Sequence, residues 1–127
     1  MIEGIQRTEE HGLRMSAEVS LLESVVATPS TSRNERAAVE TLVEWMGSHG
    51  AESFIDPAGN AVGVFGTGPR QIVLLGHIDT VGGFPPVRRE GNLLYGRGTV
   101  DAKGPLCAFA AAAAGAQIPA GWSVVVV

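Results

Sequence analysis

The run Trp122–Val127, which reads WSVVVV, constrains the fold of this chain more than any other segment. Consecutive valines without alternation are typical of a strand that is covered on both faces, as in a parallel sheet. The sequence stops inside this run, with no turn and no polar cap after it. We therefore expect a chain cut from something longer. A central strand that stands at the C-terminus is the alternative.

Composition narrows the class of protein. The 127 residues are 45% hydrophobic and 17% charged, which is enough apolar material for one domain with a core. A formal net charge of -4 disfavours a protein that binds duplexes by neutralising phosphates. A single cysteine excludes an internal disulfide and favours a reducing compartment. We find no signal-peptide pattern and no apolar stretch of ~20 residues, so we expect a cytoplasmic domain without nucleic-acid or membrane partners.

Hydrophobic spacing and turn residues predict the order of the elements. Apolar residues repeat at helical intervals from Ser16 to Pro29, which disfavours helix in the residue before it. A second helix is predicted from Ser32, the N-cap of a capping box with Glu35, as far as Gly50. The remaining prediction is a frayed arm or short helix at 1–15, a hairpin at 53–56 and 61–65, a strand at 72–75, a loop at 81–89, a third helix opened by Pro105, and the strand at 122–127. This order indicates a layered α/β domain.

Two polar residues, His77 and Asp79, follow directly after the predicted strand, which ends at Gly76. In open α/β sheets, ligands gather at the carboxyl ends of strands, and residues two apart in an extended segment point the same way. Both side chains could therefore face one pocket. An imidazole suits Zn²⁺, and a carboxylate can either bind the ion or orient the imidazole. An ordinary polar strand end is the alternative.

A second motif, GRGTVDAKG at residues 96–104, brings Asp101 to the end of a loop just before the predicted third helix. Its two leading glycines allow unusual backbone angles and close approach. A phosphate cradle does not fit, because Asp101 occupies the third glycine position of GxGxxG and Lys103 is followed by Gly104 instead of Ser or Thr. An acid that only complements the helix dipole remains an alternative.

Together, GHIDTV and GRGTVDAKG resemble the motifs of the metal-dependent amidohydrolases that include acetylornithine deacetylase, succinyl-diaminopimelate desuccinylase, aminoacylase and carboxypeptidase G2. The segment Pro29–Glu35 is similar to the helix–loop signature near the N-terminus of that family. The form AKGPL at residues 102–106 and the stretch at residues 82–88 resemble the branch that acts on lysine or ornithine attached to the amino-group carrier protein LysW. The resemblance covers roughly residues 20–127 and implies a three-layer α/β/α, zinc-peptidase-like domain with a mixed sheet.

The resemblance also implies a centre of two divalent metal ions, Zn²⁺ or Co²⁺. By motif position, His77 would bind one ion and Asp101 would bridge both. Asp79 would be the catalytic aspartate behind His77, where it holds the tautomer of the imidazole. The ions would polarise the scissile amide and acidify a water, and a glutamate would pass the water's proton to the leaving amine. The products would be free lysine or ornithine in lysine or arginine biosynthesis.

Several parts that the resemblance implies are not found in residues 1–127. The catalytic Glu-Glu pair would follow the strand at 122–127, and two further ligands and a dimerisation lid would come later. We therefore expect residues 1–127 to be the N-terminal part of the catalytic domain of a homodimeric hydrolase, inactive alone. For the parent, N-acetylornithine deacetylase or succinyl-diaminopimelate desuccinylase is the alternative. A non-catalytic α/β binding module is another, and the glycine spacing disfavours a nucleotide-binding half-domain.

Five other residues have simpler interpretations. His49 is predicted in the last turn of a helix, where a cation favours the dipole. Cys107 is expected to be a small buried hydrophobe and not a nucleophile. Lys103 is expected at most to fix the Asp101 loop, and Arg88–Arg89 to lie in a solvated loop.

Overall fold

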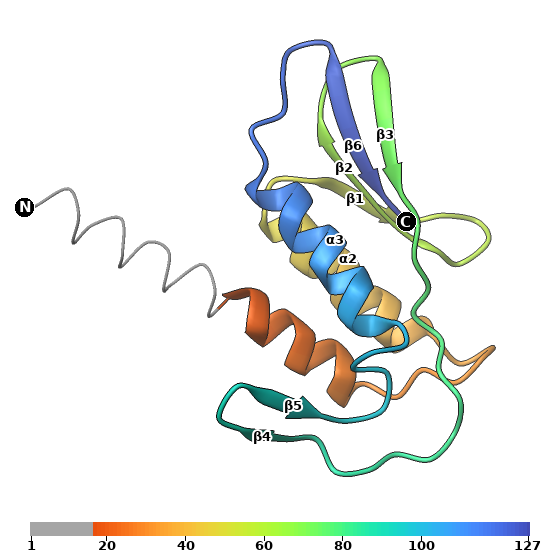
Figure 1. The fold of residues 1–127 in the computed structure, drawn as a ribbon. Helices are drawn as coiled ribbons and strands as arrows, with labels where there is room; N and C mark the ends of the chain where they lie inside the picture. Colours follow the sequence, from red (N-terminus) through yellow and green to blue (C-terminus); the bar gives the residue numbers. More distant parts are fainter. Residues whose placement is uncertain (1–16) are drawn as a thin grey trace, which may run out of the picture.

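A computed structural model describes residues 17–127, and the predicted arm at residues 1–15 lies outside them. A helix covers residues 17–27 and ends before Pro29, as predicted. The elements that follow are α2 (Arg36–Ser48), β1 (Glu52–Ile55), β2 (Ala61–Gly66), β3 (Arg70–Leu74), β4 (Arg88–Glu90), β5 (Leu93–Tyr95), α3 (Lys103–Gly115) and β6 (Trp122–Val126) (Figure 1). Among the described residues, no helix is both long and apolar enough to cross a membrane.

The valine run forms β6, an internal strand of a four-stranded mixed sheet with the order β1-β2-β6-β3. β6 pairs antiparallel with β2 on one side and parallel with β3 on the other. Val124, for example, lies opposite Phe65 and Ile72. The predicted α/β class, the mixed sheet and the internal valine strand are therefore confirmed.

One face of the sheet carries the core. Alternate residues of β2 and β6 point to this face and join one buried cluster with α2, α3 and the helix at residues 17–27; its members include Leu21, Val25, Leu42, Met46, Ala61, Phe65, Leu106 and Val126. The helices lie together beside the sheet in Figure 1. On the opposite face, Phe54 and Val73 are 46% and 56% exposed. The second helical layer of an α/β/α sandwich would cover this face and remains a prediction.

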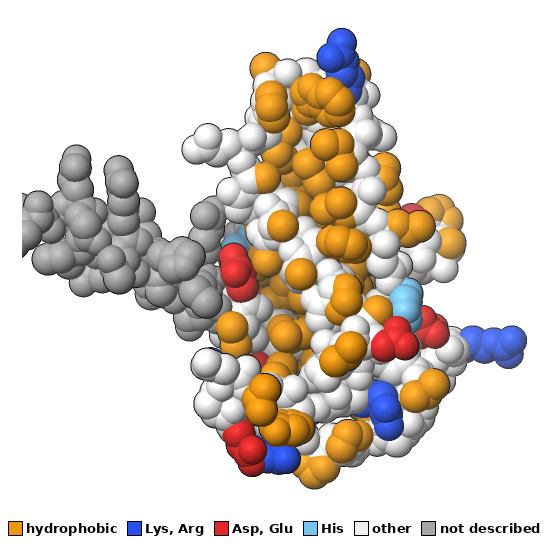
Figure 2. Space-filling model, viewed as in Figure 1, with side chains coloured by type: hydrophobic (Ala, Val, Ile, Leu, Met, Phe, Trp, Pro, Cys, Tyr) orange, Lys and Arg blue, Asp and Glu red, His pale blue; other side chains and the backbone are white. Residues whose placement is uncertain are grey.

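Hydrophobic and charged side chains are unevenly distributed over the surface seen in Figure 2. Hydrophobic side chains gather over α3 and the neighbouring strands, whereas charged side chains are mostly found toward the lower part and the edges of that view. Beyond the end of β3, Leu75 is exposed as well. Several large apolar side chains on and beside β1 and β3 are therefore exposed.

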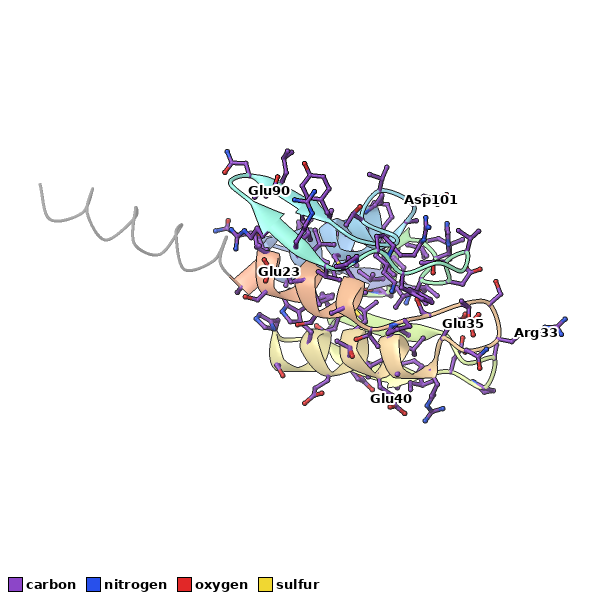
Figure 3. All side chains as sticks on the ribbon, turned by 90° about the horizontal axis from the view of Figure 1, so that it is seen from below. Glu23, Arg33, Glu35, Glu40, Glu90 and Asp101 are labelled. Atoms are coloured by element: carbon purple, nitrogen blue, oxygen red, sulfur yellow. The ribbon has the colours of Figure 1, made fainter. Side chains whose placement is uncertain are left out.

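The predicted capping box is wrong. α2 begins at Arg36, with Glu35 at the N-cap position and no side-chain cap. The Ser32 hydroxyl donates instead to Asp79 Oδ2 at 2.8 Å, while Glu35 Oε1 accepts from the backbone N–H of Arg33 at 2.7 Å. Arg33 adopts a φ of 72° in the turn between Ser32 and α2, and its side chain points outward in Figure 3. A partner that is distant in sequence has therefore replaced the local cap.

The loop predicted at residues 81–89 ends in a short strand that the residue pattern did not predict. β4 pairs antiparallel with β5, and the guanidinium of Arg88 lies 3.9 Å from the ring centroid of Tyr95. Arg89 Nη1 lies 3.2 Å from Glu23 Oε1, which ties the hairpin to the helix at residues 17–27. Both arginines are exposed, as predicted, but they belong to a strand and not to a free loop.

Cys107 lies in the core at 4% exposure, and burial raises the pKa of its thiol to about 12. Because the thiolate is the reactive form, the native thiol should be almost inert at neutral pH. We expect iodoacetamide to leave the native chain unlabelled at pH 8 and to label it fully in concentrated guanidinium, as read by mass spectrometry. Rapid labelling of the native chain would contradict the burial of α3 against the sheet.

Candidate metal-binding site

His77 and Asp79 are positioned by a segment that continues from β3. Backbone hydrogen bonds join Gly76 N–H to the Val127 carbonyl at 2.9 Å and Val127 N–H to the Leu74 carbonyl at 3.0 Å, so pairing with β6 extends past the end of β3. Gly76 also lets α3 approach, since a Cβ there would lie 3.1 Å from Leu106 Cδ1. The strand pairing therefore brings both polar side chains to the edge of the sheet beside α3.

Asp101 comes to the same edge from the loop before α3. Gly98 has a φ of 86°, a region that favours glycine, and its carbonyl accepts from Lys103 N–H at 2.9 Å. This bond closes the loop onto the first turn of α3. Asp101 itself is 87% exposed at its side chain, so its carboxylate is free to meet a ligand.

Lys103, the first residue of α3, anchors the end of this loop. It is 1% exposed, and its Nζ donates to the backbone carbonyls of Val25 at 2.9 Å and Thr28 at 2.7 Å. These carbonyls lie at the C-terminal end of the helix at residues 17–27, where the helix dipole favours a cation. Burial lowers the pKa of Lys103. These two hydrogen bonds tie the start of α3, directly after the Asp101 loop, to the end of that helix.

The three predicted site residues meet around the His77 ring. His77 Nδ1 lies 3.1 Å from Asp79 Oδ1, and His77 Nε2 lies 3.2 Å from Asp101 Oδ1. The hydrogen bond from Ser32, followed by the contact with His77, lowers the pKa of Asp79 and keeps its carboxylate ionised. Each ring nitrogen of His77 therefore faces one carboxylate.

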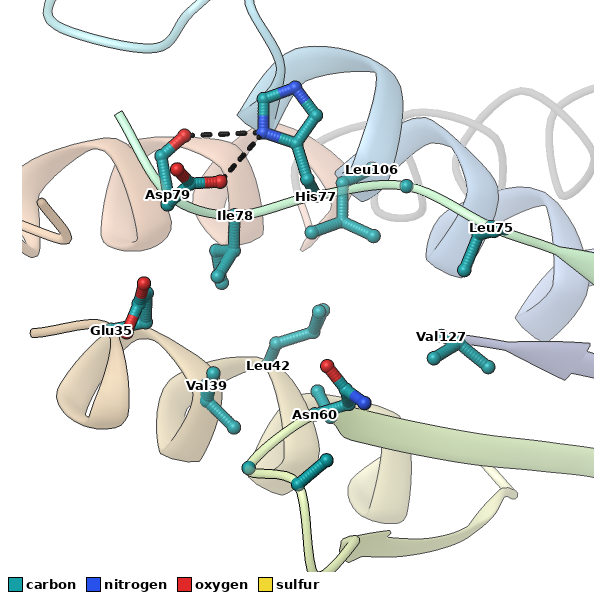
Figure 4. Close-up of a pocket in the computed structure, with 14 residues that line it drawn as sticks. Glu35, Val39, Leu42, Asn60, Leu75, His77, Ile78, Asp79, Leu106 and Val127 are labelled. Carbon is teal, nitrogen blue, oxygen red and sulfur yellow. Dashed lines mark hydrogen bonds and ion pairs between the residues drawn. The ribbon is translucent and has the colours of Figure 1, made fainter. Parts of the chain in front are cut away.

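Two cavities flank the segment that carries His77. One, of about 390 Å³, opens between this segment and the Asp101 loop and is lined by Ser32, His77, Asp79, Thr80 and residues of the 96–101 loop. The other, of about 270 Å³, lies between the segment and α2, with Glu35 and Asn60 at its wall (Figure 4). The first cavity contains all three predicted site residues and is the candidate site.

The donor atoms fit part of a metal centre. Two atoms that share one ion through bonds of about 2.0–2.2 Å lie about 3.0–3.5 Å apart, and the Nε2 and Oδ1 atoms are separated by 3.2 Å. An imidazole and a carboxylate are ordinary ligands of Zn²⁺ and related ions. Within residues 17–127, however, no group of three or more His, Cys, Asp or Glu side chains could enclose an ion. Among the described residues, the pair could therefore supply two ligands to an ion.

His49 is not part of this site. It is the C-cap residue of α2, its Nδ1 lies 2.8 Å from the Trp45 carbonyl oxygen, and its ring stacks on the Trp45 ring at 3.9 Å between centroids. This placement agrees with a structural role at the end of the helix.

Ser32 is the site residue that the residue pattern did not reveal. Its position three residues before Glu35 is the mark of a capping box, and that local pattern hid its contact with Asp79. The available signal was the likeness of Pro29–Glu35 to a family signature, which placed the segment near the site without giving its contacts.

Comparisons with known proteins point to one group. No model of a known protein family matches the chain. A LysW-lysine hydrolase from Deinococcus radiodurans is 52% identical over 93 residues, which cover 72% of this chain and 26% of that protein. A protein from Thermococcus kodakarensis, provisionally named LysW-lysine/LysW-ornithine hydrolase, is 47% identical over 92 residues, which again cover 72% of this chain and 26% of the relative.

A solved structure supports the fold. The aminoacylhistidine dipeptidase from Vibrio alginolyticus superposes with a TM-score of 0.64 and 21% identity, over 87% of this chain and 26% of the dipeptidase. The chain thus spans about a quarter of the length of the proteins that it matches. These relatives confirm the resemblance seen in the two motifs: over 72% of its length, the chain is similar to proteins named as LysW-lysine and LysW-ornithine hydrolases.

Proposed function

We propose that this chain is the N-terminal part of a metal-dependent hydrolase that cleaves an amide bond and releases lysine or ornithine from a conjugate with the carrier protein LysW. The observation that carries the proposal is the convergence of His77 Nε2 and Asp101 Oδ1 at 3.2 Å in an open cavity. The names of the relatives supply the substrate class. A smaller amino-acid amide, as in acetylornithine deacetylation or succinyl-diaminopimelate desuccinylation, is the alternative substrate.

In the proposed centre, His77 and Asp101 would hold two divalent ions, Zn²⁺ or Co²⁺, with Asp101 between them. When bound, such ions polarise an amide carbonyl and lower the pKa of a bound water toward neutrality. With its proton held on Nδ1 by Asp79, the imidazole would present the lone pair of Nε2 to an ion in the cavity. The exposed side of Asp101 leaves room for a further ligand group from outside this chain.

The same proposal includes the setting of the parent protein. We propose a cytoplasmic homodimer, in which the glutamate that accepts and returns the water's proton comes from beyond residue 127. That glutamate is essential to amide hydrolysis as general base and acid. We therefore expect the 127-residue chain alone to show no amidase activity, and steady turnover by the purified chain would contradict the proposal.

The two ligands can be tested in the longer protein. We expect His77→Ala and Asp101→Ala each to lower kcat/KM for a lysine amide conjugate at least about 100-fold, because each removes a ligand of the reactive ions. His49→Ala is the matched control, since that histidine caps α2 away from the cavity, and it should keep activity within about twofold. Unchanged activity in both site variants would overturn the proposed function.

Metal binding by the 127-residue chain is a second test. With two of the required ligands present, we expect Co²⁺ or Zn²⁺ to bind weakly in calorimetry and His77→Ala to abolish that heat. Tight binding of two ions would show that residues 1–127 already contain a complete centre, against the partial ligand set inferred here.

A further inference from the structure

The Ser32 hydroxyl bonds to one of the two carboxylate oxygens of Asp79, and the other oxygen faces His77. The hydroxyl donates to Asp79 Oδ2 at 2.8 Å, while Asp79 Oδ1 lies 3.1 Å from His77 Nδ1. The two oxygens of Asp79 are therefore engaged on different sides, one by Ser32 and one by the imidazole. A carboxylate held at both oxygens cannot turn about its terminal bond without losing a hydrogen bond.

Backbone pairing delivers Ser32 to this position. The Ser30 carbonyl accepts from Thr80 N–H at 2.9 Å, and the Ser30 hydroxyl donates to the Ile78 carbonyl at 2.7 Å. Thr31 and Thr80 form an isolated parallel bridge. Ser30 is fully buried, so these bonds are shielded from water. Residues 30–32 thus lie beside residues 78–80, joined by one isolated β-bridge and by the hydroxyl bond of Ser30, and we call residues 30–32 the strap.

The strap connects the segment that resembles the N-terminal signature to the segment that carries His77 and Asp79. A serine at the start of a helix ordinarily bonds to the backbone of the first turn, but α2 has no side-chain cap. The hydroxyl of Ser32 is directed to the Asp79 carboxylate instead. Ser32 therefore makes no capping bond to the first turn of α2, and its hydroxyl bonds instead to the carboxylate that contacts His77.

We propose that Ser32 is a positioning residue that fixes the carboxylate of Asp79 and, through it, the Nδ1–H tautomer and the orientation of the His77 ring. This inference rests on the proposed function, because the tautomer matters only if Nε2 binds a ligand in the cavity. The partners of a ligating histidine determine which nitrogen carries the proton. Ser32 extends that chain of contacts by one residue, from the strap to the metal-facing nitrogen.

The tautomer can be measured without any metal. We expect long-range ¹H–¹⁵N spectra at about pH 8.5, where an ordinary imidazole is neutral, to show the Nδ1–H tautomer of His77 in competition with the Nε2–H tautomer, because Asp101 Oδ1 lies 3.2 Å from Nε2. In Ser32→Ala the ratio of Nδ1–H to Nε2–H should fall about fivefold, as expected for loss of one hydrogen bond to a charged, exposed group. Ser32→Thr keeps a hydroxyl and should restore the ratio to within about twofold.

Ser48→Ala is the matched control. Ser48 is also exposed, and its hydroxyl bonds to the Glu44 carbonyl on α2, so its removal should leave the His77 spectrum unchanged. Because Ser32 is itself exposed, Ser32→Ala should fold, and circular dichroism checks this. An unchanged tautomer ratio in Ser32→Ala would overturn the inference. It would mean that the other contacts of the ring, among them the Asp79 backbone carbonyl 3.3 Å from Nδ1 and Asp101 Oδ1 3.2 Å from Nε2, set the tautomer without Ser32.

A Co²⁺ titration of the same variants separates this inference from the proposed function. If His77→Ala binds Co²⁺ as well as the unmodified chain, the proposed metal site fails, whatever the tautomer shows. If Co²⁺ binding depends on His77 but the tautomer ratio is the same with and without the Ser32 hydroxyl, only the proposed role of Ser32 is wrong. Support for both is a tautomer ratio that follows the hydroxyl, together with Co²⁺ affinity about three- to tenfold lower in Ser32→Ala and recovered in Ser32→Thr.

Discussion

Lys103→Met should destabilise the chain by about 2–4 kcal/mol, measured as a lower urea midpoint with an unchanged m-value. Methionine is unbranched like lysine but one atom shorter, and it cannot donate a hydrogen bond. The carbonyls of Val25 and Thr28 would then lose their bonds to the Lys103 ammonium. Each bond to a charged group contributes about 1.5–3 kcal/mol, and a buried carbonyl without a partner carries its own penalty.

An opposing effect limits the loss. Burial of an ammonium group is itself unfavourable, which is why the pKa of Lys103 is lowered, and Met removes that cost. Replacement of buried charges by hydrophobic residues can even stabilise a protein when no partner is left behind. Here two carbonyls at a helix end are left behind, so we expect destabilisation to prevail.

Arg36→Met is the matched control for Lys103→Met. Arg36 is exposed on α2 and pairs with Glu40 at 2.6 Å, an i,i+4 contact that contributes about 0.3–0.5 kcal/mol. The same change of residue type should therefore shift the urea midpoint very little at this position. A Lys103→Met chain as stable as Arg36→Met would show that the Lys103 ammonium does not hold the helix at residues 17–27.

The placement of the predicted site residues followed from rules that act over short distances. His77 and Asp79 are two residues apart in an extended segment, so their side chains share a side. Asp101 precedes a helix that packs on the same sheet, and β6 orders both segments by pairing with β3. The residue pattern was sufficient to place His77 and Asp79 after a strand and Asp101 before a helix, whereas their meeting at one site was implied by the family resemblance.

The contacts across the molecule were not predictable in the same way. Ser32 has a local alternative of similar energy, the helix cap, and only the three-dimensional position of Asp79 decides between them. β3 begins at Arg70, two residues before the apolar run, because Arg70 pairs with Trp122 of β6. A strand boundary set by a partner strand has no signature in its own residues.

The missed hairpin had a signal that was present but weak. Gly91 and Asn92 connect β4 and β5, and Gly91 has a positive φ of 56°, as tight hairpin turns require. The strand before this turn contains Arg88 and Glu90, which form an ion pair with each other, and no β-branched residue. Its composition therefore indicated a loop, and cross-strand contacts outweigh that weak preference.

Gly104→Ala should reverse the usual effect of such a substitution in a helix. Gly104 is the second residue of α3, and alanine in a helix is ordinarily favoured over glycine by about 1 kcal/mol. A Cβ at this position would lie 2.1 Å from the Thr99 carbonyl oxygen, which is backbone and cannot turn away as a flexible side chain would. We expect a net destabilisation of about 1–3 kcal/mol in urea unfolding, as for other overpacked sites.

The displacement should also reach the candidate site. Thr99 lies two residues before Asp101, so a loop pushed away from α3 would move the carboxylate away from His77 Nε2, which is now 3.2 Å distant. We expect the weak, His77-dependent Co²⁺ binding of the chain to fall at least about tenfold, because two ligands must converge on one ion. Gly82→Ala is the matched control: nothing lies within 4 Å of a Cβ there, and both stability and Co²⁺ binding should be unchanged. If Gly104→Ala were as stable as Gly82→Ala and bound Co²⁺ equally well, close packing of the loop on α3 would not be what aims Asp101 at His77.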